Sequence, residues 1–570
     1  MKVYKDTIVI LSETEVESKQ EKISELLEHK NQMCFIKKTN ENKIELFWNK
    51  NIDNIADITK IERYFEGLFT VIEEGAKFNK NSRWDGRKTF FRLNKKSDAM
   101  DIGFFNEFFR ELKDHVDKDI DTKSLTSKIK ETLWLIESEL YSEIISFVNE
   151  DTIKEWIKNS KFTYTPYDHQ IEGLVQALKY KKSLVRIPTS GGKSFLYYMY
   201  YKYFQEKIDN NFKFLLIVPN IQLIDQMIEE FTKQEHNIIK SIMPISSKHN
   251  NIFGMGLGDF MNPKKVKYNI FISTFQSLNT SDTNECADNV KEFLKNIDVI
   301  IVDEVHRSKV KTIQSVMKHS INCKFRFGQT GTFDDKNKWD MYHIFSIFRF
   351  NYKQIITTNE LIDKGISSDF EIKWRILDIY KELESWQKKS YQEEITYISE
   401  NKKREEEINK IISAEYDKDK NLLIFFHNQI VGKKHFFSFF NKYKGNVYYI
   451  DGTTNVQLRQ NIKNKIESSC GNIVFASFYT TGTGIDFKNV HKFINIQSFK
   501  SKIITFQSLG RGLRKHDSKE MFELIEVIDK FPYTNYVWKH YKERVSNYKK
   551  EFGKEKVEKW IENNTYTIED

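Results

Sequence analysis

Short runs of apolar residues alternate with helical stretches through most of the chain after residue 160. Strands of a parallel sheet that helices cover on both faces show this continuous apolar pattern, because neither face of such a strand meets water. The clearest runs are SLVRI, FKFLLIV, NIFIS, DVIIVD and FRFGQT in one series, and NLLIFF, NVYYI, NIVFAS, KFINI and FELIEVI in a second. The two series predict two α/β domains, over residues 161–350 and 351–535.

The flanking segments follow other patterns. Residues 1–110 contain FWNKN and KTFFRLN, which are typical of short strands, and ISELLEHK, which is typical of a helix, so a small α+β module is expected there. Residues 111–160 have apolar positions at helical spacing and predict a helical bridge between domains. Residues 380–415 and the tail over 536–570 are charged, with helical patterns that predict solvated helices.

Composition narrows the class of protein. The chain has 570 residues, which is too long for one hydrophobic core, and its 39% of hydrophobic residues suffices for several. A formal charge of +9 permits a nucleic-acid partner without requiring one. The four cysteines form no Cys-x-x-Cys pair, which argues against a disulfide framework or a cysteine zinc site. Because no apolar run is long enough to span a bilayer and no signal-peptide pattern opens the chain, we expect a cytoplasmic protein.

A glycine-rich loop follows the first strand of the first series. SLVRI leads into Pro188 and then Thr189-Ser190-Gly191-Gly192-Lys193-Ser194, after which a helical pattern begins. Backbone N–H groups of such a loop can surround phosphates, and the positive N-terminus of the following helix adds to the attraction. Lys193 would contact the β- and γ-phosphates, and Ser194 would place its hydroxyl on Mg²⁺. The usual pattern has Gly at the place of Ile187, so the loop by itself also fits a glycine-rich turn before a buried helix.

Acidic residues end a later strand of the same series. DVIIVD runs directly into Asp303-Glu304-Val305-His306. In open parallel sheets, ligands bind at the carboxyl ends of strands. Asp303 can hold Mg²⁺ there, largely through water, and Glu304 can orient and deprotonate an attacking water. One carboxylate after a strand is often only an acidic loop, but the pair downstream of a phosphate loop favours nucleotide hydrolysis.

A basic segment in the second α/β domain has a matching chemistry. Gln507, Arg511 and Arg514 belong to the sequence QSLGRGLR, in which the arginines are three residues apart and share one helical face. A guanidinium directed at the γ-phosphate would stabilise the charge that develops in phosphoryl transfer. Taken alone, the segment also fits a basic surface helix.

In their order along the chain, these motifs resemble those of superfamily 2 helicases and translocases, whose motor consists of two RecA-like domains. The likeness extends over roughly residues 160–520 and includes Tyr167-Asp168-His169-Gln170, Val218-Pro219-Asn220, Ser273-Thr274-Phe275-Gln276-Ser277, Thr330-Gly331-Thr332, Leu423-Ile424-Phe425-Phe426 and Thr483-Gly484-Ile485-Asp486. The resemblance implies ATP and Mg²⁺ as cofactors. It implies that Tyr167 and Gln170 recognise adenine, and that Gly484 and Asp486 approach the nucleotide from the second domain.

The resemblance assigns two further groups of residues. Nucleic-acid contacts would come from Pro219, Asn220, Thr274, Gln276 and Thr483. These would bind phosphates and so carry no sequence specificity. Coupling between the nucleotide site and the next motif would come from His306 through Gln329 or Thr330, with Thr332 close by.

A narrower likeness concerns the N-terminal module. Asn81-Ser82-Arg83-Trp84-Asp85-Gly86-Arg87, with Phe90 and then Asp101-Ile102-Gly103-Phe104, resembles the small DNA-binding module of the phage UvsW-type helicases, which remodel branched DNA. Arg83, Arg87 and Lys88 would neutralise phosphates, while Trp84 would stack on a base or support the fold. The chain departs from that family in having Val305 where the family has Cys, and Asp486 where it has a small polar residue.

The sequence therefore predicts an ATP- and Mg²⁺-dependent DNA helicase or translocase that remodels forks, junctions or R-loops in recombination, repair or replication. Its partner would be branched, forked or duplex DNA, or an RNA–DNA hybrid. An RNA helicase and a motor subunit of a restriction or defence complex are the alternatives. The latter would be active only together with its partner subunits.

Overall fold

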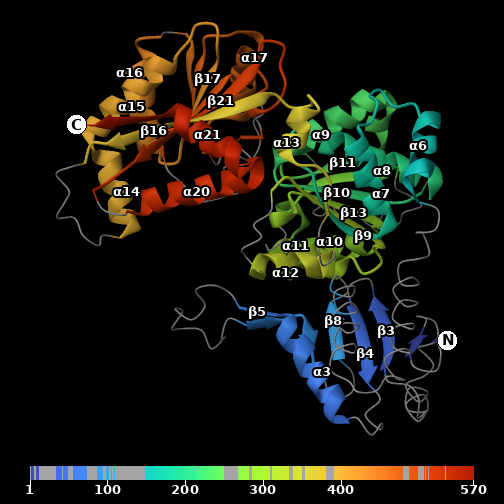
Figure 1. Ribbon diagram of the computed structural model, residues 1–570. Coiled ribbons are helices and arrows are strands. Elements are labelled where there is room, and N and C mark those ends of the chain that lie inside the picture. The colour runs from blue at the N-terminus through green and yellow to red at the C-terminus, as the bar shows by residue number, and fades with distance from the viewer. Residues whose placement is uncertain are drawn as a thin grey trace. The chain divides into compact units, whose positions relative to one another are not determined.

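Every apolar run named above forms a strand of one of two seven-stranded sheets in the computed structural model (Figure 1). All strand pairs within these two sheets are parallel, as their continuous apolar sequences predict. The chain divides into two compact units, Met1–Arg186 with Lys193–Ile355, and Ile187–Gly192 with Ile356–Asp570. The structure describes residues 2–4, 8–11, 34–40, 43–48, 55–72, 87–93, 98–101, 104, 108, 148–208, 211–249, 267–280, 285–307, 311–332, 338–348, 353–380, 390–443, 445–478, 487–497, 506, 509–510, 512–532 and 535–569.

The first large sheet has the order β11-β12-β10-β13-β14-β9-β15. Its strands are β9 (Lys182–Arg186), β10 (Phe214–Val218), β11 (Ile242–Ile245), β12 (Ile270–Thr274), β13 (Val299–Asp303), β14 (Phe325–Thr330) and β15 (Lys353–Gln354). The chain order and the spatial order differ, and helices lie in the connections from β9 to β10, β10 to β11, β12 to β13, β13 to β14 and β14 to β15, as in other doubly wound sheets.

Helices cover both faces of this sheet. One face packs its apolar side chains against α10 (Glu285–Lys295), α11 (Lys311–His319) and α12 (Lys338–Ile347). The other carries α8 (Lys193–Lys207), whose rings contact the strands directly: Phe204 lies 4.7 Å from Phe325 and Tyr200 lies 5.1 Å from Phe327, between ring centroids. The helices α6 (Glu150–Asn159), α7 (Asp168–Lys179) and α9 (Ile221–Gln234) complete the layer pattern of the unit (Figure 1).

The N-terminal module is a mixed sheet with a helix. Its sheet has the order β1-β2-β3-β4-β8-β7, and α3 (Ile55–Leu68) and the hairpin-like pair β5 (Thr70–Ile72) and β6 (Arg87–Thr89) accompany it. The sheet strands are β1 (Lys2–Tyr4), β2 (Ile8–Leu11), β3 (Cys34–Asn40), β4 (Lys43–Trp48), β7 (Phe91–Arg92) and β8 (Asp98–Asp101). KTFFRLN thus forms strands as predicted, whereas ISELLEHK and residues 111–147 of the predicted bridge lie outside the described residues.

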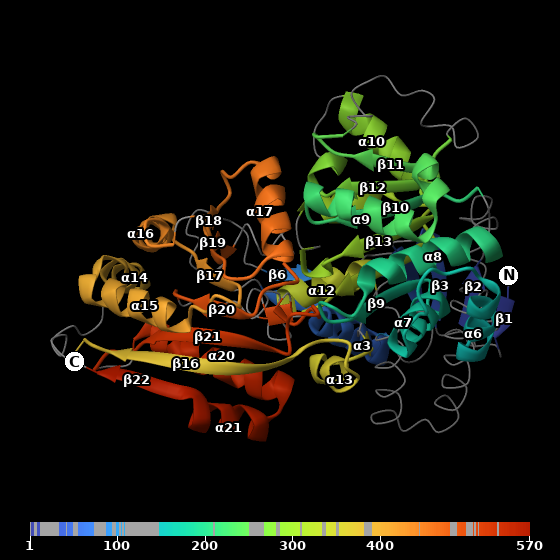
Figure 2. The same ribbon diagram turned by 90° about the horizontal axis from the view of Figure 1, so that it is seen from above.

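The second large sheet has the order β18-β19-β17-β20-β21-β16-β22. Its strands are β16 (Asp369–Asp378), β17 (Leu422–Phe426), β18 (Val447–Ile450), β19 (Ile473–Ser477), β20 (Lys492–Asn495), β21 (Met521–Asp529) and β22 (Thr565–Glu569). The sheet lies between α14 (Tyr391–Glu400), α15 (Lys402–Glu415) and α16 (Gln429–Phe440) on one face and α17 (Val456–Ser468), α20 (Tyr536–Phe552) and α21 (Lys554–Asn564) on the other (Figure 2). A short helix, α13 (Thr358–Asp363), precedes β16.

Two elements of this sheet differ from the sequence-based expectation. The sequence of β16, DFEIKWRILD, alternates charged and apolar residues and contains no continuous apolar run, so the strand was not among those predicted. The tail was expected to be helical throughout, but it ends in β22, which pairs with β16. The sequence TYTIE is rich in residues that favour strands, and its pairing satisfies an edge of the sheet that would otherwise be open.

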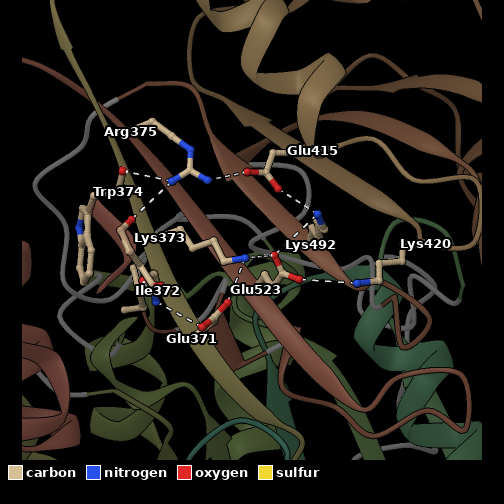
Figure 3. Close-up of polar contacts among 10 residues, drawn as sticks. Glu371, Ile372, Lys373, Trp374, Arg375, Glu415, Lys420, Lys492 and Glu523 are labelled. Carbon is tan, nitrogen blue, oxygen red and sulfur yellow. Dashed lines mark hydrogen bonds and ion pairs between the residues drawn. The ribbon is translucent and has the colours of Figure 1, made fainter. Parts of the chain in front are cut away.

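The alternation of β16 places a row of charges on one sheet face (Figure 3). Glu371 lies in register with Glu523 of β21, and Lys373 reaches both carboxylates, at 3.0 Å and 2.7 Å. The two carboxylates would repel each other in this register, and the ammonium of Lys373 offsets that repulsion. Arg375 and Glu415 extend the row with an ion pair at 2.8 Å. Lys492 and Lys420 complete it, with contacts to Glu415 and Glu523.

The helices over 390–415 are less solvated than predicted. Arg404 of α15 is 2% exposed, and its guanidinium contacts both carboxylate oxygens of Asp529, at 2.7 Å and 3.1 Å. The Tyr380 hydroxyl donates to the same carboxylate at 2.6 Å, and Arg404 also donates to the Ile496 carbonyl at 2.6 Å. A buried charge of this kind is tolerated because each charged atom has a partner. No helix among the described residues has the length and apolarity needed to cross a membrane.

We predict that Arg404→Leu destabilises the second unit by about 3–5 kcal/mol, because it leaves the Asp529 carboxylate buried without its counter-charge. Urea-dependent hydrogen exchange of peptides from α15 and β21 would measure this loss. Lys402→Ala, at an exposed position of the same helix, is the matched control and should change the unfolding free energy by less than about 0.5 kcal/mol. A loss below about 1 kcal/mol for Arg404→Leu would contradict the role of the pair.

Candidate active site

The glycine-rich loop connects β9 to α8, which begins at Lys193 as the sequence predicts. Ser190 and Gly192 have positive φ angles of 77° and 76°, and the Gly191 N–H donates to the Pro188 carbonyl at 3.1 Å. This conformation is easy for glycine but costs an L-residue such as Ser190 roughly 1–2 kcal/mol. Strain of this size is characteristic of functional loops, and the turn leaves the N-terminus of α8, with Lys193 and Ser194 in its first turn, at the end of β9.

Register places the ends of the central strands at one edge of the first sheet. Val218 of β10 pairs with Thr274 of β12, Asp303 of β13 pairs with Gln329 of β14, and Thr330 pairs with Arg186 of β9. The candidate nucleotide residues and the candidate nucleic-acid residues of this unit therefore follow neighbouring strand ends. That edge is the usual ligand side of an open parallel sheet.

Glu304 is the centre of a polar network at this edge. The Lys193 ammonium lies 3.2 Å from Glu304 Oε1, and the Thr330 hydroxyl donates to Oε2 at 3.1 Å. His306 Nδ1 lies 3.3 Å from the same Oε2 and 3.1 Å from the Thr330 hydroxyl. Burial alone would raise the pKa of the Glu304 carboxyl, but Lys193, His306 and the Thr330 hydrogen bond hold it well below its ordinary value. Glu304 is therefore a carboxylate whose charge is fully compensated by its neighbours.

The network reaches the next motif through the threonines. The Thr330 hydroxyl also accepts the Thr332 N–H at 3.2 Å, and its single proton is shared between Glu304 Oε2 and the Thr332 carbonyl, which lies 2.7 Å away. Both threonines are almost completely buried. A buried chain of hydrogen bonds thus connects Glu304 with the backbone after β14.

Asp303 has a different environment from its neighbour. It is buried, and the hydroxyl of Tyr197 in α8 donates to its Oδ1 at 2.7 Å. Burial and the nearby Glu304 charge raise the pKa of Asp303, while burial and the Asp303 carboxylate raise that of Tyr197, so that the phenol remains a hydrogen-bond donor. The Tyr197 hydroxyl thus fixes the orientation of the Asp303 carboxylate.

Sequence reasoning did not identify Tyr197 or Tyr200. The run FLYYMYYKYF after the loop predicts a helix but no role for its individual tyrosines. Tyr197 is four residues after Lys193, so the two share a helix face, and that spacing was the available signal. The Tyr200 hydroxyl accepts from Gln329 Nε2 at 2.9 Å and donates to the Gly173 carbonyl of α7 at 3.3 Å, which ties α7 to β14.

The candidate adenine residues begin α7. Gln170 is buried and its Oε1 accepts the Tyr167 N–H at 2.9 Å, which closes a capping box. Tyr167 is half exposed and stacks on His169, with 5.4 Å between ring centroids. The structure thus explains why a glutamine at this position begins the helix well, and it leaves the Tyr167 ring accessible.

The candidate nucleic-acid residues of this unit include both exposed and structural positions. Asn220 follows Pro219 and caps α9 by accepting the Leu223 N–H at 3.0 Å. Thr274 is buried and its hydroxyl lies 3.0 Å from that of Ser277, whereas Gln276 is exposed.

In the N-terminal module, Lys88 contacts the first large sheet's helix layer. Its ammonium lies 3.1 Å from His343 Nδ1 in α12, and Gln314 Nε2 lies 2.9 Å from the same atom. An ammonium can only donate, so Nδ1 is an acceptor and the imidazole is neutral. Burial first, and then Lys88, lowers the pKa of His343 to about 4. Arg87 is exposed in β6.

Several predicted site residues lie outside the described residues: Arg83, Trp84, Thr483, Gly484, Asp486, Gln507 and Arg511. Arg514 is described. It is partly exposed, its backbone forms a bridge with Ser367, and its carbonyl accepts from the Ser368 hydroxyl at 3.4 Å.

Comparisons with known proteins agree with this geometry. Residues 148–335 match the family model described as "Type III restriction enzyme, res subunit", and residues 403–516 match "Helicase conserved C-terminal domain". The ATP-dependent DNA helicase uvsW of Enterobacteria phage T4 is 28% identical over 503 residues, which are 84% of this chain and 92% of that protein.

Two solved structures are similar to this chain, and the first of them shares its fold. The type ISP restriction-modification enzyme LlaBIII bound to DNA has a TM-score of 0.52 at 17% identity, over 71% of this chain and 31% of that one. The crystal structure of T4 UvsW aligns over 94% of this chain and 99% of its own, with 21% identity and a TM-score of 0.42. With its two matched domains and its long alignment with the phage protein, the chain is similar to superfamily 2 helicases of the UvsW type.

Proposed function

We propose that this chain hydrolyses ATP to move on DNA and that it remodels branched DNA or R-loops. The observation that supports this most strongly is the network of Lys193, Glu304, His306 and Thr330 beside Asp303 at the carboxyl edge of the first sheet. It unites a phosphate-binding lysine, a base for water and a metal-binding carboxylate with a route to the next motif. The branched-DNA preference rests on the similarity to uvsW, which is a DNA helicase.

Lys193 has two competing partners in this proposal. Without nucleotide its ammonium pairs with Glu304, which keeps the pKa of that carboxyl low. A triphosphate would draw Lys193 away, since its phosphates carry more charge than one carboxylate. Glu304 would then lose its strongest counter-charge and its pKa would rise, which makes it a better base for the attacking water. Glu304 would thus become an effective base only once the phosphates of a nucleotide have bound to Lys193.

Mg²⁺ would be held by Asp303 and Ser194. A carboxylate oxygen and a hydroxyl are ligands that magnesium prefers, and bound Mg²⁺ would neutralise charge on the β- and γ-phosphates. Tyr197 fixes the orientation of the Asp303 carboxylate through Oδ1 and so determines where Oδ2 points.

We predict that Tyr197→Phe raises the Mg²⁺ concentration needed for half-maximal ATP hydrolysis by about tenfold, which corresponds to the loss of one hydrogen bond to a charged group. Titration of Mg²⁺ at saturating ATP would measure it. Tyr200→Phe is the matched control, because it removes a buried hydroxyl of the same helix that contacts Gln329 and Gly173 instead of a carboxylate. An equal Mg²⁺ shift in both variants would assign the effect to packing and not to Asp303.

Arg514 is proposed to stabilise the charge that develops on the γ-phosphate. Arg514→Ala is then expected to slow nucleic-acid-stimulated ATP hydrolysis by about 10³-fold or more, with little change in ATP affinity. Lys515→Ala, at the adjacent exposed position, should leave the rate nearly unchanged. Single-turnover hydrolysis and binding of a fluorescent ATP analogue would separate the two quantities. A loss confined to ATP affinity would contradict the assigned role.

The function as a whole is tested by comparing substrates. ATP hydrolysis and strand displacement should be stimulated by forks, four-way junctions and R-loops, and more weakly by RNA alone. Glu304→Gln and Lys193→Ala should abolish hydrolysis on every substrate while DNA binding persists, because both residues act on the nucleotide. Normal turnover in both variants would refute the site, and stimulation by RNA only would support an RNA helicase.

The match to a restriction-enzyme subunit favours one alternative function, a motor subunit of a restriction or defence complex. The same assay distinguishes it. A motor that works by itself should hydrolyse ATP on DNA as a purified chain, whereas a subunit would remain inactive until its partner subunits are added.

A further inference from the structure

The outer face of α16 carries an apolar stripe that no part of the nucleotide site uses. Ile430 is 68% exposed, Phe437 is 62% exposed and Phe440 is 45% exposed. Lys433 stands between them and is also exposed. Large apolar side chains exposed singly are common, but several on one helical face mark an interaction site.

The spacing of the stripe has a clear geometric meaning. Ile430, Lys433, Phe437 and Phe440 follow each other at intervals of three, four and three residues, which places them along one line of the helix. The opposite side of α16, with Val431, His435 and Phe439, is buried against the second sheet. Intervals of three and four are those of seams between packed helices. The stripe is therefore shaped to receive another helix.

The stripe is also preformed. Phe436, which is only partly buried, lies 5.3 Å from the Phe437 ring and 5.2 Å from the Phe440 ring, and 5.4 Å from Tyr449 of β18. The exposed rings thus rest on an aromatic base that is fixed to the sheet. Because these rings already have restricted freedom, a partner would lose little additional entropy in ordering them.

Charge indicates the chemistry of the partner. Residues 429–446, QIVGKKHFFSFFNKYKGN, contain lysines at 433, 434, 442 and 444 and no acidic residue. Lys434 reaches Glu405 of α15 only at 3.9 Å, and it lies beside the stripe that contains Lys433. A surface with exposed apolar positions between lysines is complementary to a helix with leucine-like residues on one face and carboxylates beside them.

Position favours a protein partner over nucleic acid. α16 follows the carboxyl end of β17, so in a parallel crossover it runs back toward the amino ends of the strands. Phe437 and Phe440 lie in its second half, away from the edge at which strands of such sheets bind ligands. Ile430 also lacks the ring that base stacking requires. We propose that α16 docks an acidic amphipathic helix of a partner protein, an interaction separate from ATP hydrolysis.

Fluorescence anisotropy of the full chain with two labelled helical peptides of about 20 residues would test this. Both peptides carry leucine at heptad positions, with glutamate elsewhere in one and lysine elsewhere in the other. The acidic peptide should bind at least about tenfold more tightly than the basic one, and Phe437→Ser should weaken it by about tenfold or more. Ser438→Ala, at a neighbouring exposed position, should bind like the wild type.

Lys433→Glu should weaken binding of the acidic peptide and strengthen binding of the basic one, and misfolding cannot produce this pair of opposite effects. Thermal melting of each variant, with ATP hydrolysis on forked DNA, should match the wild type. Equal binding of both peptides, or no effect of Phe437→Ser, would overturn the proposal. Binding of a single-stranded oligonucleotide, but not of the peptide, in a Phe437-dependent way would also overturn it. The same holds if light scattering shows that the wild type is a dimer and that Phe437→Ser dissociates it.

Discussion

The parallel alignment of the first sheet is the constraint on which the candidate site depends. When strands run in one direction, their carboxyl ends meet at one edge, and each register pair fixes which residues become neighbours there. The pairing of Asp303 with Gln329 brings the acidic motif beside Thr330, and α8 brings Lys193 and Tyr197 to the same place. A shift of one residue in β13 or β14 would turn these side chains to the other face and disperse the network.

Buried charge is handled in the same way at the site and away from it. Glu304 has Lys193, and Asp303 has the Tyr197 hydroxyl. In the second unit, the Glu526 carboxylate lies 3.1 Å from Nε of Arg544 and accepts a hydrogen bond from the Tyr548 hydroxyl at 2.6 Å. The same combination of an arginine and a phenol surrounds Asp529. The difference lies in permanence. The charged groups of the pairs in the second unit are almost completely buried, whereas the partner of Glu304 is a lysine that, under the proposed function, a phosphate would draw away.

Most strands of the two large sheets could be predicted from the sequence, and the features that could not be predicted have physical causes. Continuous apolar runs identified the strands that are buried on both faces, and motif residues marked the strand ends. β16 could not be recognised in this way because Glu371, Lys373 and Arg375 interrupt its apolar pattern. Only the three-dimensional structure shows that Lys373 neutralises Glu371 and that carboxylates of other elements neutralise Lys373 and Arg375. The contact between Tyr197 and Asp303 could not be predicted, because a tyrosine in an aromatic run is usually part of the core. The contact also depends on a distance to Asp303 that no local sequence pattern encodes. The burial of Arg404 depends likewise on Asp529, a residue of a distant strand.

The position of β16 between β21 and β22 has a consequence for biosynthesis. Its neighbours lie far downstream, since contacts from this part of the chain span sequence separations of 149 and 189 residues. At ribosomal rates of about 5–20 residues per second, the strand would emerge roughly 10–30 s before β21 and β22 can pair with it. During that interval both of its edges are open to other nascent chains. The charges that alternate along β16 are the kind that prevent such edges from aggregating, so the same side chains that later lock the register would first protect the unfinished domain.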